Sequence, residues 1–216
     1  MIDLGFAVEG AEAARHAAVP TLLLKLRLTN AQPATPVQNV LLQCQLRIEP
    51  TRRQYAPGEH EPLGELFGTP DRWGVSLHGV LWTYVNALVP AFEGGCSFNL
   101  PVPCSYDFNI AATKYFYGLE DGEAPLALLF SGTVFYRDRD GRLQIVQIGH
   151  DKEASYRLPV QIWRAMMDHY YPDTVWLRID RDVFADLYRY KRQNGLARWE
   201  DALRSLLREH AAEAGR

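Results

Sequence analysis

The chain has 216 residues, of which 47% are hydrophobic and 23% are charged, a composition typical of a folded globular protein and unlike that of a disordered one. Its formal net charge of −3 gives no general attraction to nucleic acid or to anionic membranes, so we expect neither as a partner. No run reaches the roughly 18 apolar residues of a membrane-spanning helix, and the N-terminal MIDLGFAVEG carries an acid where a signal peptide has a basic region, which predicts a cytoplasmic protein.

Alternation of apolar and polar residues predicts four half-buried strands, because successive side chains of a strand point to opposite faces. The clearest is TLLLKLRLTN, in which the leucines share one face. Pro101 and Pro103 lack backbone N–H donors, so the last of the four strands is predicted to lie at a sheet edge or to bend there. The alternating runs are residues 2–8, 22–28, 40–48 and 98–110.

Three further strands are predicted downstream of these runs. Residues 81–89 and 126–136 are apolar on both sides for part of their length, which is typical of central strands. Asp140-Gly141 is a strong hairpin signal, because both central residues of a type I′ turn need positive φ, and it predicts a strand over 143–148. About seven strands without helices between them predict a mainly β fold, an antiparallel, immunoglobulin-like β-sandwich over residues 1–150.

The periodicity changes after residue 150 and predicts an α-helical C-terminal extension, residues 151–216, packed on the sandwich. Pro159 suits the first turn of one helix, which Pro172 ends. Asp180 is the predicted N-cap of a second helix, which stops at Asn194-Gly195, and VWLRI before it is a weak candidate strand. A third helix begins near Trp199, and 209–216 is expected to fray. The predicted buried stripes are Val160, Trp163, Met166, Met167 and Tyr170, then Val183, Phe184, Leu187, Tyr188 and Tyr190, then Trp199, Leu203, Leu206 and Leu207.

The segment 50–79 breaks this regularity, because Pro and Gly recur every few residues and no period persists. Structureless connections longer than about 15 residues are uncommon and are often functional. This loop also holds the Arg and aromatic side chains that the centres of protein interfaces favour. We therefore predict a partner-binding surface with Arg52, Arg53, Tyr55, Phe67 and Trp73 as the candidate contacts.

Four consecutive residues, His150, Asp151, Lys152 and Glu153, could each serve as an acid, a base or a ligand. Adjacent side chains of an extended chain point in opposite directions, so the four cannot form a catalytic set by themselves. We interpret them as a polar turn and keep His150 with Glu153 as an alternative polar site.

Signatures of common enzyme classes are absent from the sequence, which contains no GxSxG, no GxxxxGK[ST] and no GxGxxG. The histidines form no HxH or HxxxH pair and the cysteines no CxxC pair, so no metal or other cofactor is expected. Glu59, His60 and Glu61 could supply one or two ligands at most.

The three cysteines, Cys44, Cys96 and Cys104, are an odd number, which does not indicate a disulfide framework. Cys44 and Cys104 share the parity of apolar strand residues, and Cys96 lies just ahead of Phe98. We expect all three to be reduced, buried and unreactive.

Three parts of the chain, VQNVLLQCQLRIEP, PVPCSYDFNIAATKYFYGLEDGEAPLALLFSGTVFY, and KEASYRLPVQIWRAMMDHYYP continuing to RDVFADLYRYK, resemble an uncharacterised bacterial family known only as a domain of unknown function. The resemblance covers nearly the whole chain. It implies no established activity, and therefore no functional residues for this sequence. It does imply genes that lie beside those of uptake nickel-iron hydrogenases, and with them an accessory or assembly role.

The sequence therefore predicts a non-catalytic protein that acts by binding another protein, with a hydrogenase-related partner implied by the resemblance. One alternative is a metal-binding module or an enzyme that uses His150, Glu153 and His60. Another is a homo-oligomer that assembles through an exposed sandwich edge, although Pro101 and Pro103 oppose pairing at their own strand.

Overall fold

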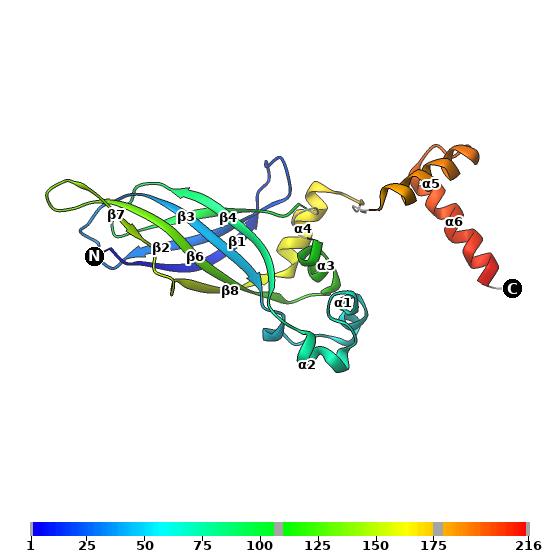
Figure 1. The fold of residues 1–216 in the computed structure, drawn as a ribbon, viewed down its shortest axis with the longest axis horizontal. Coiled ribbons are helices and arrows are strands. Elements are labelled where there is room, and N and C mark those ends of the chain that lie inside the picture. The colour runs from blue at the N-terminus through cyan, green and yellow to red at the C-terminus, as the bar shows by residue number, and fades with distance from the viewer. Residues whose placement is uncertain (1, 106–109, 175–178, 215–216) are drawn as a thin grey trace. The chain divides into compact units, whose positions relative to one another are not determined.

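The computed structural model describes residues 2–105, 110–174 and 179–214. The chain divides into two compact units, Met1–Thr174 and Val175–Arg216. The first is mainly β and built from antiparallel sheets, and the second is helical (Figure 1). The division falls later than the predicted boundary at 150/151, because a strand and a helix that follow residue 150 belong to the first unit.

One sheet has three antiparallel strands in the order β1-β2-β5, which are Leu4–Ala13, Thr21–Asn30 and Gly95–Pro103. The predicted alternation is confirmed most clearly in β2, where every second residue from Leu22 to Leu28 is fully buried. β5 pairs only with β2 among the described strands, which confirms that its prolines lie at an edge. The predicted continuation of this strand to residue 110 is wrong, because β5 ends at Pro103 and a helix begins at Ile110, while residues 106–109 lie outside the described part.

The other sheet has five strands in the order β4-β3-β6-β7, with β8 also paired to β6. The central position predicted for residues 126–136 is confirmed, because β6 pairs with β3, β7 and β8. The central position predicted for residues 81–89 is wrong, because β4 pairs only with β3 among the described strands. The bounds are Val37–Ile48 for β3, Val80–Val89 for β4, Glu123–Arg137 for β6, Leu143–Gln147 for β7 and Glu153–Pro159 for β8.

β7 and β8 lie one after the other along the same side of β6. β8 was not predicted, although Ala154, Tyr156 and Leu158 alternate with exposed residues, and it raises the described strands from the expected seven to eight. Between the two pairings, Gly132 of β6 has a φ of +132°. A Cβ there would lie 2.0 Å from the carbonyl oxygen of Leu41, so β6 can approach β3 at this point only with glycine.

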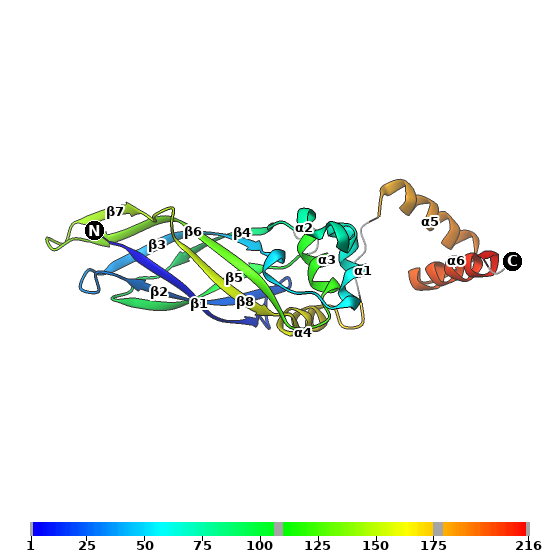
Figure 2. The same cartoon turned by 90° about the horizontal axis from the view of Figure 1, so that it is seen from below.

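Figure 2 shows how the strands of the two sheets are arranged. The buried faces of the two sheets contribute to one hydrophobic core. Phe6 of β1 stacks on Phe130 of β6 with ring centroids 4.2 Å apart, so the two sheets meet through aromatic as well as aliphatic side chains. The immunoglobulin-like arrangement of these strands stays a prediction.

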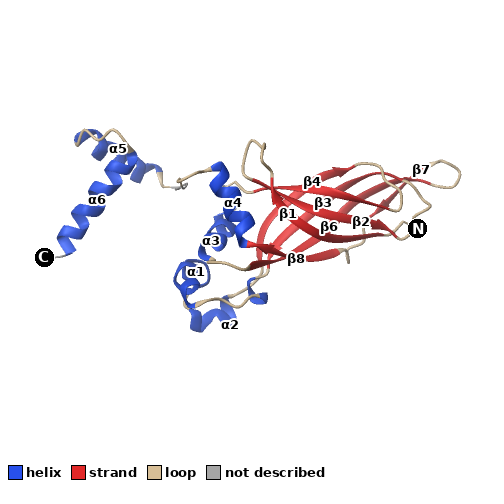
Figure 3. Ribbon diagram, turned by 180° about the vertical axis from the view of Figure 1, so that it is seen from behind, coloured by secondary structure: helices blue, strands red, loops and turns tan. Residues whose placement is uncertain are grey.

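Helices of the first unit gather at one end of its strands, contrary to the prediction of strands without intervening helices (Figure 3). The segment 50–79 is also ordered, because it contains η1 (Pro50–Arg52), η2 (Pro57–Glu59), α1 (His60–Phe67), η3 (Pro70–Arg72) and α2 (Trp73–Ser76). These turns are too short for a helical period to show between the prolines and glycines. α3 (Ile110–Gly118) and α4 (Val160–Tyr170) pack together, with Trp163 stacked on Phe116 at 5.0 Å.

The predicted stripe of α4 is confirmed in its main part, since Val160, Trp163, Met166 and Met167 are buried. The second unit contains α5 (Arg181–Gln193) and α6 (Trp199–Ala214), and Asp180 is the N-cap of α5 as predicted. The candidate strand VWLRI falls largely on residues 175–178, which lie outside the described residues. Fraying from residue 209 is not found, because α6 continues to Ala214. Among the described residues, no helix is long and apolar enough to cross a membrane.

Candidate functional site

The aromatic residues predicted as partner contacts in segment 50–79 point into the protein. Phe67 and Trp73 are buried, and Tyr55 is partly buried. The Trp73 ring meets the rings of Tyr55 and Phe67 edge-on at 5.2 and 6.3 Å, and its Nε1 donates a hydrogen bond to the carbonyl oxygen of Gly68 at 2.9 Å. Phe67 and Trp73 therefore belong to the hydrophobic core, with Tyr55 packed against it, and they anchor the segment there.

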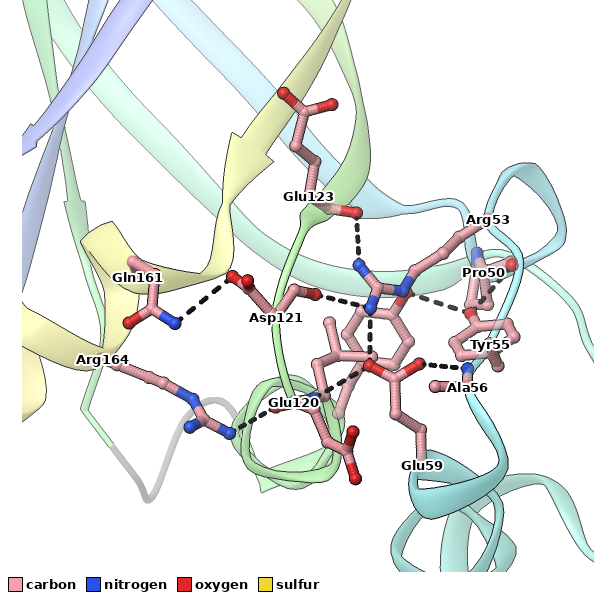
Figure 4. Close-up of polar contacts among 12 residues, drawn as sticks. Pro50, Arg53, Tyr55, Ala56, Glu59, Glu120, Asp121, Glu123, Gln161 and Arg164 are labelled. Carbon is pink, nitrogen blue, oxygen red and sulfur yellow. Dashed lines mark hydrogen bonds and ion pairs between the residues drawn. The ribbon is translucent and has the colours of Figure 1, made fainter.

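Arg53 is also turned inward, with only 10% of its side chain exposed. Its Nη2 lies 2.6 Å from Oε1 of Glu59 and donates to the carbonyl oxygen of Asp121 at 2.7 Å (Figure 4). Its Nη1 donates to the carbonyl oxygen of Glu123 at 2.8 Å. The guanidinium thus joins segment 50–79 to the strand connection that leads into β6.

Glu59 completes this link from the other side, and its side chain is only 1% exposed. Its two carboxylate oxygens accept backbone N–H bonds from Ala56 and from Glu120, each at 2.9 Å. Charge and hydrogen-bonding capacity are both satisfied, as a buried carboxylate requires. We call Arg53 and Glu59 the buried ion pair, which links segment 50–79 to residues 120–123.

Hydroxyl and guanidinium groups extend the same network. The hydroxyls of Tyr55 and Tyr115 lie 3.0 Å apart, and burial raises the pKa of both, so both phenols stay protonated at neutral pH. Arg164 of α4 donates to the carbonyl oxygen of Leu119, and Gln161 donates to the carboxylate of Asp121 at 3.3 Å. These contacts fix residues 119–123 between segment 50–79 and α4.

An open cleft of about 770 Å³ lies beside the buried ion pair. The Arg53 side chain at this cleft is committed to Glu59 and to backbone carbonyls, so it cannot serve as a free anion ligand. Arg157 donates a long bond of 3.5 Å to the carbonyl oxygen of Arg52, and Arg52 is the exposed member of the five predicted contacts. The cleft is lined by Thr51, Arg52, Arg53, Gln54, Gly122, Glu123 and Arg157.

His150, Asp151 and Lys152 lie in the connection between β7 and β8, and Glu153 is the first residue of β8. His150, Asp151 and Glu153 are exposed, whereas Lys152 reaches Oδ1 of Asp3 at 2.6 Å. This hydrogen bond is the main cause that raises the pKa of Lys152, and it ties the start of β1 to the edge of the other sheet. The structure therefore brings Lys152 together with Asp3 and does not bring His150 together with Glu153 in a common site.

Among the residues that the structure describes, no group of three His, Cys, Asp or Glu side chains could hold a metal ion. Two ligands are fewer than a protein metal site normally uses, so the geometry gives no support to the His150 and Glu153 alternative.

Burial explains the expected behaviour of the thiols. It raises the pKa of Cys44 and of Cys104 to about 12, while Cys96 is half-buried and its pKa is raised by the same cause. At pH 8 the native chain is expected to react with iodoacetamide at Cys96 before the other two, because the reactive thiolate also requires access. Mass spectrometry of the labelled peptides checks this order, and equal labelling of all three in the native chain would contradict it. Unfolded chain, in which all three react, is the control.

The C-terminal unit presents a different surface. Phe184, Tyr188 and Trp199 contact one another, with centroid distances of 5.1 to 6.3 Å, yet each stays 36–47% exposed. Their apolar neighbours on the same sides of the two helices are also left uncovered within this unit, so the helix pair by itself does not bury the predicted stripes. We call this surface the hairpin face, and it consists of Val183, Phe184, Tyr188, Trp199, Leu203 and Leu207.

Polar contacts hold the two helices together beside the hairpin face. The Tyr190 hydroxyl lies 2.9 Å from Oγ of Ser205 and 2.6 Å from Oε1 of Glu209. Lys191 lies over the Trp199 ring at 5.5 Å, and Arg192 lies over the Tyr188 ring at 5.9 Å. The aromatic cluster is thus bordered by two cations. The amphipathic pattern of the sequence indicates an apolar side of each helix, but it does not show what covers that side.

A comparison with family models gives a match over almost the whole chain. The family described as "Family of unknown function (DUF6084)" matches residues 1–215. The chain belongs to the DUF6084 family. Among curated proteins, no relative matches it. The resemblance to an uncharacterised family is thereby confirmed, and membership of DUF6084 assigns neither an activity nor a site.

Proposed function

We propose that this DUF6084 protein is a non-catalytic binding protein that attaches to another protein through the hairpin face. The observation that carries the proposal is the exposure of aromatic and aliphatic side chains on two helices that bury almost nothing between them. Ala202 is the only buried residue that the structure describes in α5 and α6. Helices of this length are marginal in water without tertiary packing, so we expect this face to be covered in the working protein.

The chemistry of the hairpin face suggests the kind of partner. Aromatic side chains next to cations are typical of the energetically dominant centres of protein interfaces. Lys191 and Arg192 at the border favour a partner surface with an apolar centre and acidic residues around it. The family resemblance adds components of a nickel-iron hydrogenase system as the first candidates, and a cytoplasmic setting belongs to the same proposal.

The test is affinity purification of the tagged full chain from its native cells, followed by identification and reconstitution of the complex from purified components. Leu207 is 69% exposed, so Leu207→Asp should leave the hairpin folded and remove an apolar contact. We expect the reconstituted complex to weaken by about 30-fold, as for a contact worth about 2 kcal/mol.

The matched control is Leu143→Asp, which changes a leucine of β7 that is 56% exposed and should leave the affinity unchanged. A complex that survives both Leu207→Asp and Trp199→Ala would contradict the proposal. So would the absence of any complex together with hydrogen-exchange protection of the hairpin in the isolated chain, because the chain itself would then cover this face.

A further inference from the structure

The free edges of the two sheets differ in how they are protected against pairing with another strand. An unprotected edge presents unpaired N–H and C=O groups, and proteins usually block it with charges, prolines, bulges or short strands. Among the described strands, β5 carries Pro101 and Pro103, and β1 carries Glu9, Glu12 and a register shift between Val8 and Gly10. These two edges of the three-stranded sheet are therefore blocked.

One edge of the five-stranded sheet is blocked as well. β7 has only five residues, and β8 carries Glu153 and Arg157. The polar connection at His150 and Asp151 interrupts the two strands, so no long run of backbone stays available along this side of β6. The predicted polar turn therefore keeps this edge of the sheet from offering one long strand for pairing.

β4, at the opposite edge, has neither the charged residues nor the prolines that block the other edges. Its sequence VLWTYVNALV contains no charged residue and no proline over ten residues. A register shift lies near its start, between the pairs Leu46 with Thr83 and Arg47 with Leu81, and the pairing with β3 is regular from Thr83 to Val89. No other described strand pairs with β4, so one side of this regular run has no strand partner within the described residues.

The outward side chains of β4 are apolar at the same place. Tyr84 is 55% exposed and Leu88 is 60% exposed, and Leu88 lies opposite the exposed Leu41 of β3. A groove of about 420 Å³ runs beside them, lined by Leu41, Leu42, Gln43, Asn86, Ala87 and Leu88. Association between strands of two molecules requires an uncharged strand edge, and an exposed apolar strip beside it favours the contact. The main-chain hydrogen bonds then provide affinity, and the side chains fix the register.

We propose that β4 pairs antiparallel with β4 of a second copy of this chain, so that the two five-stranded sheets join into one. The edge suits pairing with its own copy, because a two-fold axis places the same run of residues opposite itself. Since this run is uncharged, no like charges face each other across the joint. The joined sheet brings the apolar strip around Leu41 and Leu88 of one copy next to that of the other. This interface is separate from the hairpin face and does not depend on it.

Sedimentation velocity of the full chain tests the pairing, with a dimer expected within concentrations up to about 100 μM. Asn86→Lys places a lysine at the joint in each copy and is expected to raise the dimer dissociation constant by about tenfold or more. Gln43→Lys is the matched control, because Gln43 is the exposed cross-strand neighbour of Asn86, one strand away from the joint. Each substitution removes the Gln43 to Asn86 hydrogen bond, and Gln43→Lys also removes the bond that Ser131 donates to Gln43, so the control disturbs its own sheet at least as much as Asn86→Lys does.

Hydrogen exchange gives an independent readout, since backbone amides of residues 83–89 should become more protected as the concentration rises. A chain that stays monomeric over the whole range would overturn the proposal, and so would a dimer that Asn86→Lys and Gln43→Lys weaken equally. A dimer that is lost in Leu207→Asp but kept in Asn86→Lys would show pairing through the hairpin instead. Loss of the protein partner in Leu207→Asp with the dimer intact supports both proposals separately.

Discussion

Glu59→Ala is expected to lower the free energy of unfolding by about 3–5 kcal/mol, because it leaves the Arg53 guanidinium buried without its counter-charge. The same change removes the acceptor of two backbone N–H groups, those of Ala56 and Glu120. An unsatisfied buried donor adds to the cost. Urea unfolding followed by circular dichroism measures the change.

Two further variants separate the buried ion pair from general damage to the segment. Arg52→Ala removes an exposed arginine next to Arg53 and is expected to change stability by less than about 0.5 kcal/mol. The double variant Arg53→Ala/Glu59→Ala should cost less than the sum of its single variants, because the two side chains are in direct contact. A loss below about 1 kcal/mol for Glu59→Ala would show that the pair does not hold this segment.

Much of the β unit could be predicted because its strands are one-sided. The alternation in β2 and β3 reports burial on one face directly, and Pro101 and Pro103 gave the edge position of β5. The same signal failed at residue 110, because Ile110 has the parity of the run and yet begins α3. The alternation of apolar and polar residues indicates which side chains are apolar. It does not show where the backbone stops being extended, which in this run is at Pro103.

The buried ion pair could not be predicted from the sequence, for a different reason. Arg53 and Glu59 are six residues apart in an irregular segment, and the other acceptors of Arg53 are backbone carbonyls of residues 121 and 123. No pattern of residue types reveals which carbonyl groups will come near a side chain. The partner-binding prediction for Phe67 and Trp73 had a related weakness, because aromatic residues fill cores and interfaces alike.

The C-terminal helices show the limit of amphipathic patterns. The predicted start and stop of α5 are confirmed, because Asp180 is its N-cap, Asn194 is its C-cap and Gly195 has a positive φ. The apolar stripes of α5 and α6 are also present, yet within this unit most of their members are exposed, and Leu187, Tyr190 and Leu206 are half-buried. A stripe shows that a surface needs cover and does not say whether the same chain, a second copy or another protein provides it.

Trp73→Ala is expected to cost about 3–5 kcal/mol, as is typical for removing a large buried aromatic side chain. The ring contacts Tyr55, His60 and Phe67, so its loss opens a cavity under segment 50–79, and limited proteolysis should then cut within residues 60–79. Val75→Ala, in the same helix but almost fully exposed, is the control and should leave both stability and proteolysis unchanged. Reduced partner binding by Trp73→Ala would therefore report a disordered segment. Arg52→Ala, at an exposed residue, tests the predicted partner-binding surface of segment 50–79 without unfolding it. If Trp73→Ala stayed as stable as the wild type and still lost a partner, the ring would be a direct contact, contrary to its burial.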